Sequence, residues 1–232
     1  MPRAIPRHRF HDLLEAATAV FLEQGYRRTQ MADVAARMGL AKGTVYLYVE
    51  SKEALFDAVL RHSDARAPVE LPDRLPIPTP TPRSTLEMVR KRVADEATLP
   101  ALAAALTRHR VADVRAELDA IVREVYDTLA RNRIGIKLLD RCSLDHPNLA
   151  AVWFTSGRRG TLALVERYLE DRIRRGRIPR VVDVALTARM ALETLAFWAV
   201  HRHWDPSPQP IDETSARDAV VEFLSRALLG EP

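Results

Sequence analysis

The sequence predicts an all-α fold, and three observations support this prediction. Apolar residues recur at spacings of three and four along the chain, which is typical of amphipathic helices. The sequence contains no run of alternating β-branched residues bounded by turn pairs, so strand signals are nearly absent. Only 8 of the 232 residues are glycine, which disfavours a turn-rich β-sandwich or a glycine-rich nucleotide-binding fold.

Composition and charge narrow the class of protein. Hydrophobic residues make up 47% and charged residues 28% of the chain, which is typical of a folded globular protein. The net charge of +4 permits an anionic partner without proving one. The single cysteine, Cys142, excludes an internal disulfide framework and a multi-cysteine zinc site. The first ten residues carry three arginines and no apolar run, so we expect no signal peptide and a cytoplasmic protein.

The first helix is expected to carry its apolar face over residues 10–21, and two short helices with a tight turn between them follow it. The first helix has one apolar face and ends at Gly25, which suits a left-handed helix cap. In the pair of short helices, Ala35 is small enough for close approach, Gly39 allows a sharp turn, and Val45 points back at the first helix. This spacing is what a helix-turn-helix requires.

The second short helix, expected over residues 42–49, presents an outer face that suits DNA. Lysine donates hydrogen bonds to guanine or phosphate, threonine and tyrosine hydroxyls reach phosphate oxygens, and glycine lets the backbone approach closely. The face consists of Lys42, Gly43, Thr44, Tyr46, Leu47 and Tyr48. The alternative is a solvated helical hairpin with locally packed tyrosines, because such patterns also arise by chance in helical proteins.

The residues that flank this pair of helices strengthen the DNA-binding interpretation. Ser51 is expected to cap a helix that runs to about residue 66, and Lys52 would complete a phosphate clamp at its start. Thr29 takes the equivalent place before the first short helix. Residues 1–48 carry seven Lys and Arg against four acidic residues, so most of the excess charge lies here. An arm suited to the minor groove carries Arg3, Arg7 and Arg9.

A proline-rich stretch follows this region. Six of the fifteen residues from 68 to 82 are proline, so the stretch cannot be the interior of a helix. We interpret residues 67–83 as a semi-rigid, extended connector; the alternative is a proline-rich ligand for a signalling domain. The connector would separate an N-terminal domain, residues 1–66, from a helical C-terminal domain, residues 84–232.

Six helices are expected in the C-terminal domain. The first begins near Ser84, which would act as N-cap, with Glu87 completing a capping box. A short alanine-rich helix follows Pro100. The remaining helices are expected over residues 113–141, 147–175, 181–204 and 212–229.

The N-terminal region resembles the DNA-binding domain of the TetR family of bacterial transcriptional regulators. The motifs that carry the resemblance are Leu14-Glu-Ala-Ala, Phe21-Leu-Glu-Gln-Gly-Tyr, Met38-Gly-Leu-Ala-Lys-Gly-Thr-Val-Tyr-Leu-Tyr-Val and Ser51-Lys-Glu-Ala-Leu-Phe. The sequence departs from the family pattern at Gln30, where a second threonine is common, at Ala41, where a serine often caps the recognition helix, and at Val49, where phenylalanine is usual. The missing serine weakens that cap by about 1 kcal/mol.

The resemblance implies a ligand-responsive regulator, most often a repressor, that binds a near-palindromic DNA operator as a homodimer. The C-terminal domain would hold the effector and dimerise through its last two helices. An apolar stripe on these helices supports this, although the first of them would also suit a core helix. Arg189 and Glu193, four residues apart, are costly for a membrane span. The expected interface residues are Leu192, Leu195, Ala196, Phe223 and Leu224.

A pocket for a small, mainly apolar effector is expected among the middle helices of the C-terminal domain. Arg158 would serve an anionic group of the effector, and aromatic and aliphatic side chains would surround its body. The expected lining residues are Met88, Tyr126, Leu129, Ile136, Trp153, Phe154, Arg158 and Tyr168. The alternative for each of them is an ordinary place in the core or on the surface.

No catalytic residue, cofactor or metal site is expected. Cys142 and His146 are four residues apart, but Pro147 follows at once, so the helix ends there and the spacing loses its geometric meaning. His201 and His203 lie near a helix end, where basic residues are favoured. The leading hypothesis is therefore a transcriptional regulator. The alternatives are a helical enzyme that has put the N-terminal domain to another use, and a DNA-binding protein without an effector.

Overall fold

The computed structural model describes residues 8–65 and 67–230, and it has the predicted all-α fold. The described residues contain one extended pairing, an isolated parallel bridge between Val49 and Ile77. The chain forms two compact units. Unit 1 comprises Met1–Val93 and Ile134–Trp153, and unit 2 comprises Ala94–Arg133 and Phe154–Pro232. These bounds differ from the predicted domain limits at residues 66 and 84, because the connector and three later helices lie wholly or mostly in unit 1.

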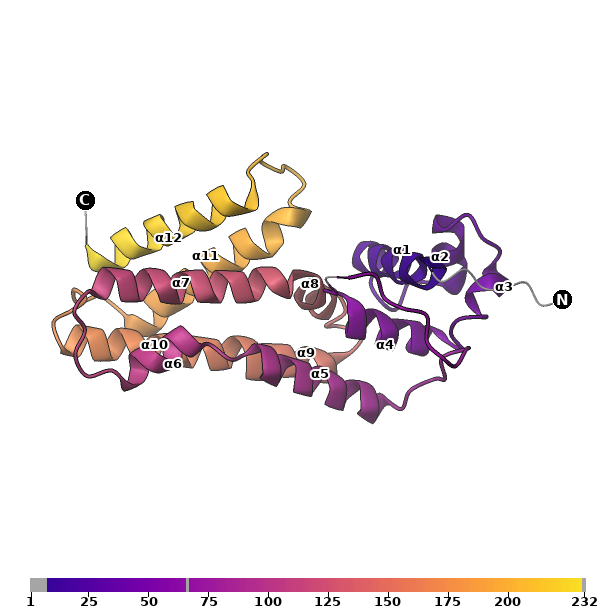
Figure 1. Ribbon diagram of the computed structural model, residues 1–232, viewed down its shortest axis with the longest axis horizontal. Coiled ribbons are helices and arrows are strands. Elements are labelled where there is room, and N and C mark those ends of the chain that lie inside the picture. The colour runs from indigo at the N-terminus through magenta and orange to yellow at the C-terminus, as the bar shows by residue number, and fades with distance from the viewer. Residues whose placement is uncertain (1–7, 66, 231–232) are drawn as a thin grey trace. The chain divides into compact units, whose positions relative to one another are not determined.

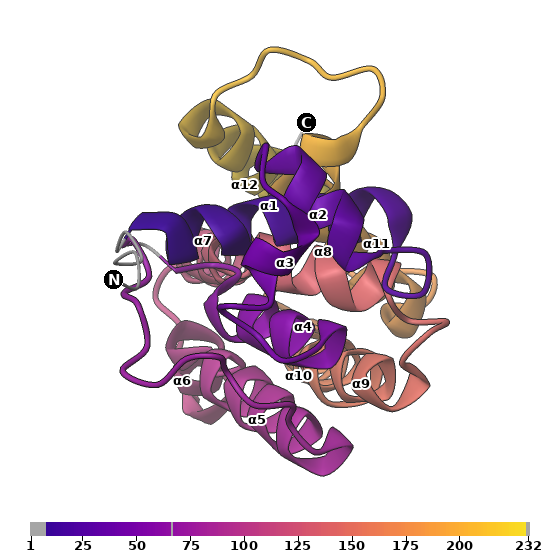
Figure 2. The same cartoon turned by 90° about the vertical axis from the view of Figure 1, so that its right-hand side faces the viewer.

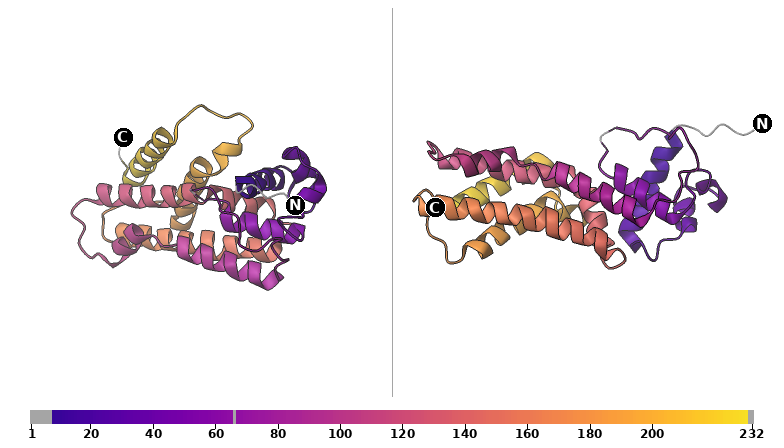
Figure 3. Two further views of the ribbon diagram at one scale, coloured as in Figure 1. Left: turned by 45° about the vertical axis from the view of Figure 1, so that its right-hand side comes forward. Right: turned by 90° about the horizontal axis from the view of Figure 1, so that it is seen from below.

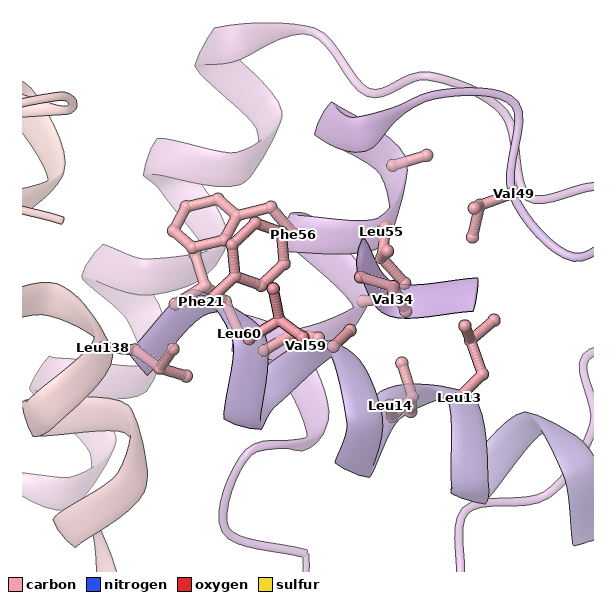
Figure 4. Packing of buried hydrophobic residues seen from close by; sticks show 14 of the residues in the cluster. Leu13, Leu14, Phe21, Val34, Val49, Leu55, Phe56, Val59, Leu60 and Leu138 are labelled. Carbon is pink, nitrogen blue, oxygen red and sulfur yellow. The ribbon is translucent and has the colours of Figure 1, made fainter. Parts of the chain in front are cut away.

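Unit 1 is built around a small apolar core (Figure 4). In this unit α1 packs against α2 and α4, and α3 lies against α2 (Figure 2). Leu13, Phe21, Val34 and Leu55 are fully buried between these helices, as the apolar spacing of α1 predicts. The helices that lie wholly or mostly in unit 1 are α1 (His8–Gln24), α2 (Met31–Arg37), α3 (Lys42–Val45), α4 (Lys52–His62), α5 (Pro82–Glu96), α8 (Arg133–Arg141) and α9 (Pro147–Ala151) (Figure 1).

Gly39 ends α2 with the backbone geometry that the sequence predicts. Its φ is +65°, in the left-handed region that favours glycine. The Gly39 N–H donates to the carbonyl of Ala36 at 3.0 Å, and the Leu40 N–H donates to the carbonyl of Ala35 at 2.9 Å. These two hydrogen bonds form a Schellman motif, which satisfies the last carbonyls of α2 and turns the chain toward α3.

We expect Gly39→Val to lower the free energy of unfolding by about 1–2 kcal/mol, because a β-branched residue is strained at positive φ. A Cβ at this position would meet no atom within 4 Å, so the backbone conformation alone carries the effect. Thermal melting of Gly39→Val beside Gly39→Asn measures it, since asparagine tolerates the left-handed region better. A Gly39→Val melting curve that matches the parent's would contradict this account.

The predicted helix over residues 113–141 is interrupted at Asn132, and the interruption gives unit 1 a capped helix start. The backbone N–H groups of Ile134 and Gly135 each donate to the Asp64 carboxylate at 2.9 Å. Arg92 pairs with the same carboxylate at 2.7 Å. Asp64 therefore satisfies the first amides of α8. A continuous helix would have used these amides internally.

The first C-terminal helix also begins earlier than expected. Helix α5 starts at Pro82, which is favoured in the first turn of a helix. The Ser84 N–H donates to the hydroxyl oxygen of Thr81 at 3.2 Å, and the Ser84 hydroxyl donates to the Thr81 carbonyl at 2.8 Å. Thr81 thus occupies the capping place that the sequence analysis gave to Ser84, and Ser84 lies within the first turn.

Unit 2 is a bundle in which α11 packs against α7, α10 and α12 (Figure 3). Three helices of this unit begin after an aspartate that acts as N-cap: Asp113, Asp183 and Asp212. In each case the aspartate carboxylate accepts the backbone N–H three residues later. These local signals were readable in the sequence. The elements that lie wholly or mostly in unit 2 are α6 (Pro100–Thr107), α7 (Val114–Arg131), a π-helical segment (Val152–Arg158), α10 (Arg159–Arg174), α11 (Val184–Ala199), a 3₁₀ turn (His201–Trp204) and α12 (Glu213–Leu229).

Candidate nucleic-acid interface

The exposed side of α3 is the candidate for contact with DNA. Val45 is buried against α2, as predicted, and this fixes which side of α3 faces outward. Lys42 and Gly43 are exposed, and Tyr46 and Leu47 have exposed fractions of 40% and 54%. Thr44 is half-buried. We call the surface formed by Lys42, Gly43, Thr44, Tyr46 and Leu47, on α3 and the turn after it, the α3 face.

The placement of Tyr48 on this face is wrong. Its side chain is only 2% exposed and its ring stacks on Phe10, with the ring centroids 6.4 Å apart. Burial raises the pKa of the Tyr48 hydroxyl. The helix itself ends at Val45, and Tyr48 lies three residues later, on the same side as this buried valine. That spacing in the sequence was the signal that could have placed Tyr48 in the core.

Thr29 is also buried rather than available to phosphate, which corrects a second prediction. Its side chain is 1% exposed, and its hydroxyl donates to the carbonyl of Gly25 at 2.7 Å. The N-cap of α2 is instead Gln30, whose backbone N–H donates to the Asp33 carboxylate at 2.8 Å. Thr29 therefore holds the turn between α1 and α2 together and has no hydroxyl proton left for a ligand.

Lys52 has a structural role that the sequence analysis missed. Its ammonium donates to the carbonyls of Tyr26 and Thr29, both at 3.1 Å, and lies 4.5 Å from the centre of the Tyr26 ring. The interpretation of Lys52 as part of a phosphate clamp is therefore wrong, because its hydrogen bonds are directed into unit 1. Ser51 does cap α4 as predicted, since its hydroxyl oxygen accepts the Ala54 N–H at 3.1 Å.

Two exposed arginines beside the start of α2 extend the candidate interface. Arg27 and Arg28 precede Gln30, and all three side chains are exposed. Neither arginine forms an ion pair within the part of the chain that the structure describes. Their charge counted toward the basic balance of the N-terminal region, but they were not named as contacts. Of the predicted arm, Arg9 is half-buried at the start of α1, and Arg3 and Arg7 lie outside the described residues.

The proline-rich connector is part of unit 1 and packs against its apolar core instead of acting as a spacer. Its Ile77 N–H donates to the Tyr48 carbonyl at 2.8 Å, and the Glu50 N–H donates to the Ile77 carbonyl at 3.0 Å. The Thr79 hydroxyl donates to the hydroxyl oxygen of Ser51 at 2.8 Å. The connector residues that pack against the core are Val69, Leu71, Leu75 and Ile77. The connector thus holds the short segment that joins α3 to α4.

We expect Ile77→Pro to lower the free energy of unfolding by about 1–2 kcal/mol, because it removes the N–H that the Tyr48 carbonyl accepts. Ile77→Val keeps the N–H and most of the side chain, so it should cost about 0.5 kcal/mol. Thermal melting of the two variants separates the hydrogen bond from the packing. Equal melting temperatures would show that the bridge to Tyr48 contributes nothing.

The residues predicted to line one effector pocket are divided between the two units. Met88, Ile136 and Trp153 belong to unit 1, where they contribute to its core or pack against it. The others, Tyr126, Leu129, Phe154, Arg158 and Tyr168, belong to unit 2.

Three of the candidates in unit 2 already have polar partners. The Tyr126 hydroxyl donates to Glu213 at 2.8 Å, and burial raises its pKa to about 12. Arg158 pairs with Glu193, so it is not the free cation that an anionic effector would need. Tyr168 is buried, and its hydroxyl lies 3.3 Å from Glu117. Leu129 and Phe154 are half-buried and remain candidates.

The predicted dimer residues mostly face the interior of unit 2. Leu192, Leu195 and Leu224 are each 4% exposed, and Ala196 is half-buried, so they pack within one subunit. Only Phe223, with 61% exposed, points outward as predicted. A different apolar stripe on α11 and α12 faces outward, and it consists of Leu186, Met190, Phe197 and Phe223. A helix that is apolar on nearly all sides does not reveal from its sequence which side faces inward.

Cys142 and His146 do not form a reactive pair. Helix α8 ends at Arg141, and the His146 N–H donates to the Cys142 carbonyl in the following turn. Cys142 is buried, and burial raises the pKa of its thiol to about 11, which disfavours the nucleophilic thiolate. Over residues 8–65 and 67–230, no group of three or more His, Cys, Asp and Glu side chains is arranged to hold a metal ion.

Comparison with known proteins identifies the family. Residues 13–59 match the family model described as bacterial regulatory proteins, tetR family, and this range contains α2, α3 and the turn between them. These residues therefore form a helix-turn-helix domain of the TetR family. This range is the DNA-binding part of a transcriptional regulator.

The relatives that this chain resembles are themselves named as transcriptional regulators. This chain is 26% identical over 216 residues to the uncharacterized HTH-type transcriptional regulator YhgD of Bacillus subtilis (strain 168). The aligned region covers 93% of this chain and 94% of that protein. This chain is also 42% identical over 50 residues to the HTH-type transcriptional repressor KstR2 of Mycobacterium tuberculosis (strain ATCC 25618 / H37Rv), which covers 22% and 25% of the two chains.

A solved structure shows that the likeness in fold extends over both units. The ketosteroid transcriptional regulator KstR2 of Mycobacterium tuberculosis has a TM-score of 0.54 to this chain at 18% identity, and the match covers 96% of this chain and 93% of that one. None of the helices described for this chain is long and apolar enough to cross a membrane.

Proposed function

We propose that this protein is a ligand-responsive repressor, active in the cytoplasm, that binds a near-palindromic operator as a homodimer and is released by a small, mainly apolar effector. The DNA-binding part of this proposal rests on the exposed α3 face, which lies on a core of buried residues. The name of the KstR2 relative supports repression, because that protein is a transcriptional repressor and is similar in the DNA-binding region.

Each subunit would place its α3 face in the major groove. Lys42 and Thr44 would contact base edges, while Tyr46 and the exposed Arg27 and Arg28 would contact phosphates. A two-fold dimer would present its two α3 faces about 34–36 Å apart, so that they meet successive turns of the groove. Operator half-sites should therefore be related by two-fold symmetry.

Selection of duplexes from a random pool by the full-length chain, followed by footprinting, tests this proposal. We expect enrichment of a sequence with inverted half-sites whose centres are about one helical turn apart. A promoter fused to the selected sequence should then give less transcript when the protein is present. Absence of enrichment would contradict operator binding, and a rise in transcript would contradict repression.

The exposed apolar stripe on α11 and α12 supports the homodimer. Leu186, Met190, Phe197 and Phe223 are 41–63% exposed, which is unusual for large apolar side chains outside an interface. Two copies of α11 and α12 that meet through this stripe would form a four-helix interface, which buries it in both subunits.

We expect Met190→Lys combined with Phe223→Lys to raise the dimer dissociation constant by at least about thirtyfold, because charges would be buried at the centre of a two-fold contact. Leu144→Lys is the matched control, since Leu144 is 96% exposed and lies in unit 1. Sedimentation velocity measures both variants. A parent that is monomeric at micromolar concentration, or a double variant that dimerises like the parent, would contradict the proposed interface.

The effector is expected to bind among the middle helices of the C-terminal region, where Leu129 and Phe154 are still available as apolar contacts. A ligand at about 100 times its dissociation constant stabilises the folded protein by about 2.7 kcal/mol. Thermal melting against a panel of small apolar metabolites should therefore identify compounds that raise the melting temperature. The same compounds should lower the affinity for the selected duplex, and a regulator without an effector would show neither change.

A further inference from the structure

A cavity of about 420 Å³ lies within unit 1, away from the α3 face and from the predicted effector residues. Four segments of the chain form its wall: the turn after α1, the first turns of α4, the start of α5 with the end of the connector, and the start of α9. None of the predicted effector residues lines it. The volume is in the range that holds a small organic molecule.

One wall of the cavity is aromatic. The rings of Tyr26, Phe56 and His146 pack on one another, with ring centroids 4.2–5.2 Å apart. Burial lowers the pKa of His146, so its ring is neutral at pH 7 and does not add a positive charge. Its Nε2 atom is buried and has no hydrogen-bond partner within the described part of the chain. The wall thus offers aromatic faces and a neutral imidazole.

Two carboxylates complete the wall. Glu53 accepts the Tyr26 hydroxyl at 2.9 Å, and Asp145 accepts the Arg27 N–H at 2.8 Å. A hydrogen bond from its own backbone N–H lowers the pKa of Glu53, so this side chain is ionised at neutral pH. Among the described residues neither carboxylate has an ion-pair partner, and the one cationic side chain in the wall, Arg83, pairs with Glu87 at 2.8 Å.

We propose that this cavity binds an organic cation with an aromatic or aliphatic body. A cation gains from the faces of the aromatic rings and from two carboxylates that form no ion pair within the described residues, whereas an anion would be repelled by both. The position of Lys52 illustrates the first effect, because its ammonium already lies over the Tyr26 ring. This site is separate from the one proposed for the apolar effector.

The cavity wall adjoins residues whose hydrogen bonds hold the segments before α2 and after α3 in place. Glu53 follows Lys52, which binds the carbonyls of the turn before α2. Pro80, also in the wall, follows Thr79, which binds Ser51 and the Glu50 carboxylate. A ligand that contacts both walls therefore acts on the supports of α2 and α3. The inference that it alters DNA affinity rests on the proposed function as a DNA-binding regulator.

A pair of probes of matched shape and opposite charge tests the site. The cation is (naphthalen-1-ylmethyl)trimethylammonium and the anion is naphthalen-1-ylmethanesulfonate. Isothermal titration calorimetry of each into the full-length protein, without DNA, measures binding directly. We expect the cation to bind at least about tenfold more tightly than the anion, because the carboxylates attract one and repel the other.

The double variant E53Q/D145N provides the residue-level test, because it removes both charges and keeps a side-chain oxygen that accepts the hydrogen bonds of Tyr26 and Arg27. We expect the double variant to bind the cation at least about fivefold more weakly than the parent. The control is E15Q, which removes an exposed carboxylate on α1 that does not line the cavity, and it should bind the cation as the parent does. Failure of the cation to bind, or equal binding by E53Q/D145N and the parent, would overturn the proposal.

The link to DNA is measured separately, by the affinity for the selected duplex with and without a saturating concentration of the cation. We expect at least about a fivefold change that E53Q/D145N abolishes. Unchanged duplex affinity while the cation is bound would overturn the link to DNA. If the cation binds and no duplex does, the proposed regulatory function fails while the cation site stands. If a duplex binds and the cation does not, the cation site is overturned while the proposed regulatory function stands.

Discussion

Arg172→Met is expected to lower the free energy of unfolding by about 3–5 kcal/mol, because it leaves a buried carboxylate without its main partner. The Arg172 side chain is 0% exposed, and its Nε donates to Glu117 at 2.8 Å. Its Nη2 donates to the carbonyl of Ala105 at 2.7 Å. Both partners lie inside unit 2, so the arginine joins α6, α7 and α10. Urea denaturation of the parent and the variant measures the loss.

A second variant separates the cost of the lone charge from the loss of packing. Glu117→Met combined with Arg172→Met replaces both partners by apolar side chains and leaves no buried charge, so it should recover more than half of the lost stability. The hydrogen bond of Arg108 to Glu117 is partly exposed and contributes little by comparison. A double variant as unstable as Arg172→Met would show that the lone Glu117 carboxylate is not the cause of the loss.

Lys42→Ala is expected to weaken binding to the selected duplex by at least about thirtyfold, since a contact of this kind is worth about 1–3 kcal/mol and a dimer loses it twice. Lys42 is exposed at the start of α3, so its removal should leave the melting curve unchanged. Fluorescence anisotropy with a labelled duplex at fixed salt measures the affinity. Lys91→Ala is the control, because Lys91 is an exposed lysine on α5.

Tyr46 extends the same test to the middle of the α3 face. Tyr46→Phe removes only the hydroxyl and Tyr46→Ala removes the ring as well, so the pair distinguishes a phosphate hydrogen bond from a packing contact. We expect Tyr46→Ala to weaken binding at least as much as Tyr46→Phe. Affinities of both Lys42→Ala and Tyr46→Ala equal to the parent's would show that the α3 face does not contact DNA.

The features that sequence reasoning predicted correctly depend on a few neighbouring residues. The left-handed turn at Gly39 and the helix cap at Ser51 each satisfy backbone groups within a few positions. The exposed α3 face followed from the burial of Val45 in the same way. Such interactions are visible in a sequence because the partners are close along the chain.

Several of the predictions that failed concern partners that are distant in the sequence. Lys52 binds carbonyls more than twenty residues earlier, and the Ile77 N–H meets Tyr48 across the turn and α4. A charge beside a helix start looks the same in the sequence whether it turns outward to phosphate or inward to a carbonyl. The dimer stripe failed for a related reason, since Leu192 and Met190 are both apolar and only packing decides which one is buried.

The dependence of duplex affinity on salt tests most directly whether the α3 face binds DNA. Anisotropy titrations of the selected duplex between about 50 and 200 mM salt should give a logarithm of affinity that falls linearly with the logarithm of salt concentration. The Arg28→Ala dimer should lower the steepness of this dependence by about 2, one for each lost phosphate contact, whereas Lys42→Ala, which loses base contacts, should weaken binding at every salt concentration. An affinity that does not respond to salt, a slope that is the same for Arg28→Ala and the parent, or a Lys42→Ala affinity that equals the parent's at every salt concentration would contradict the account.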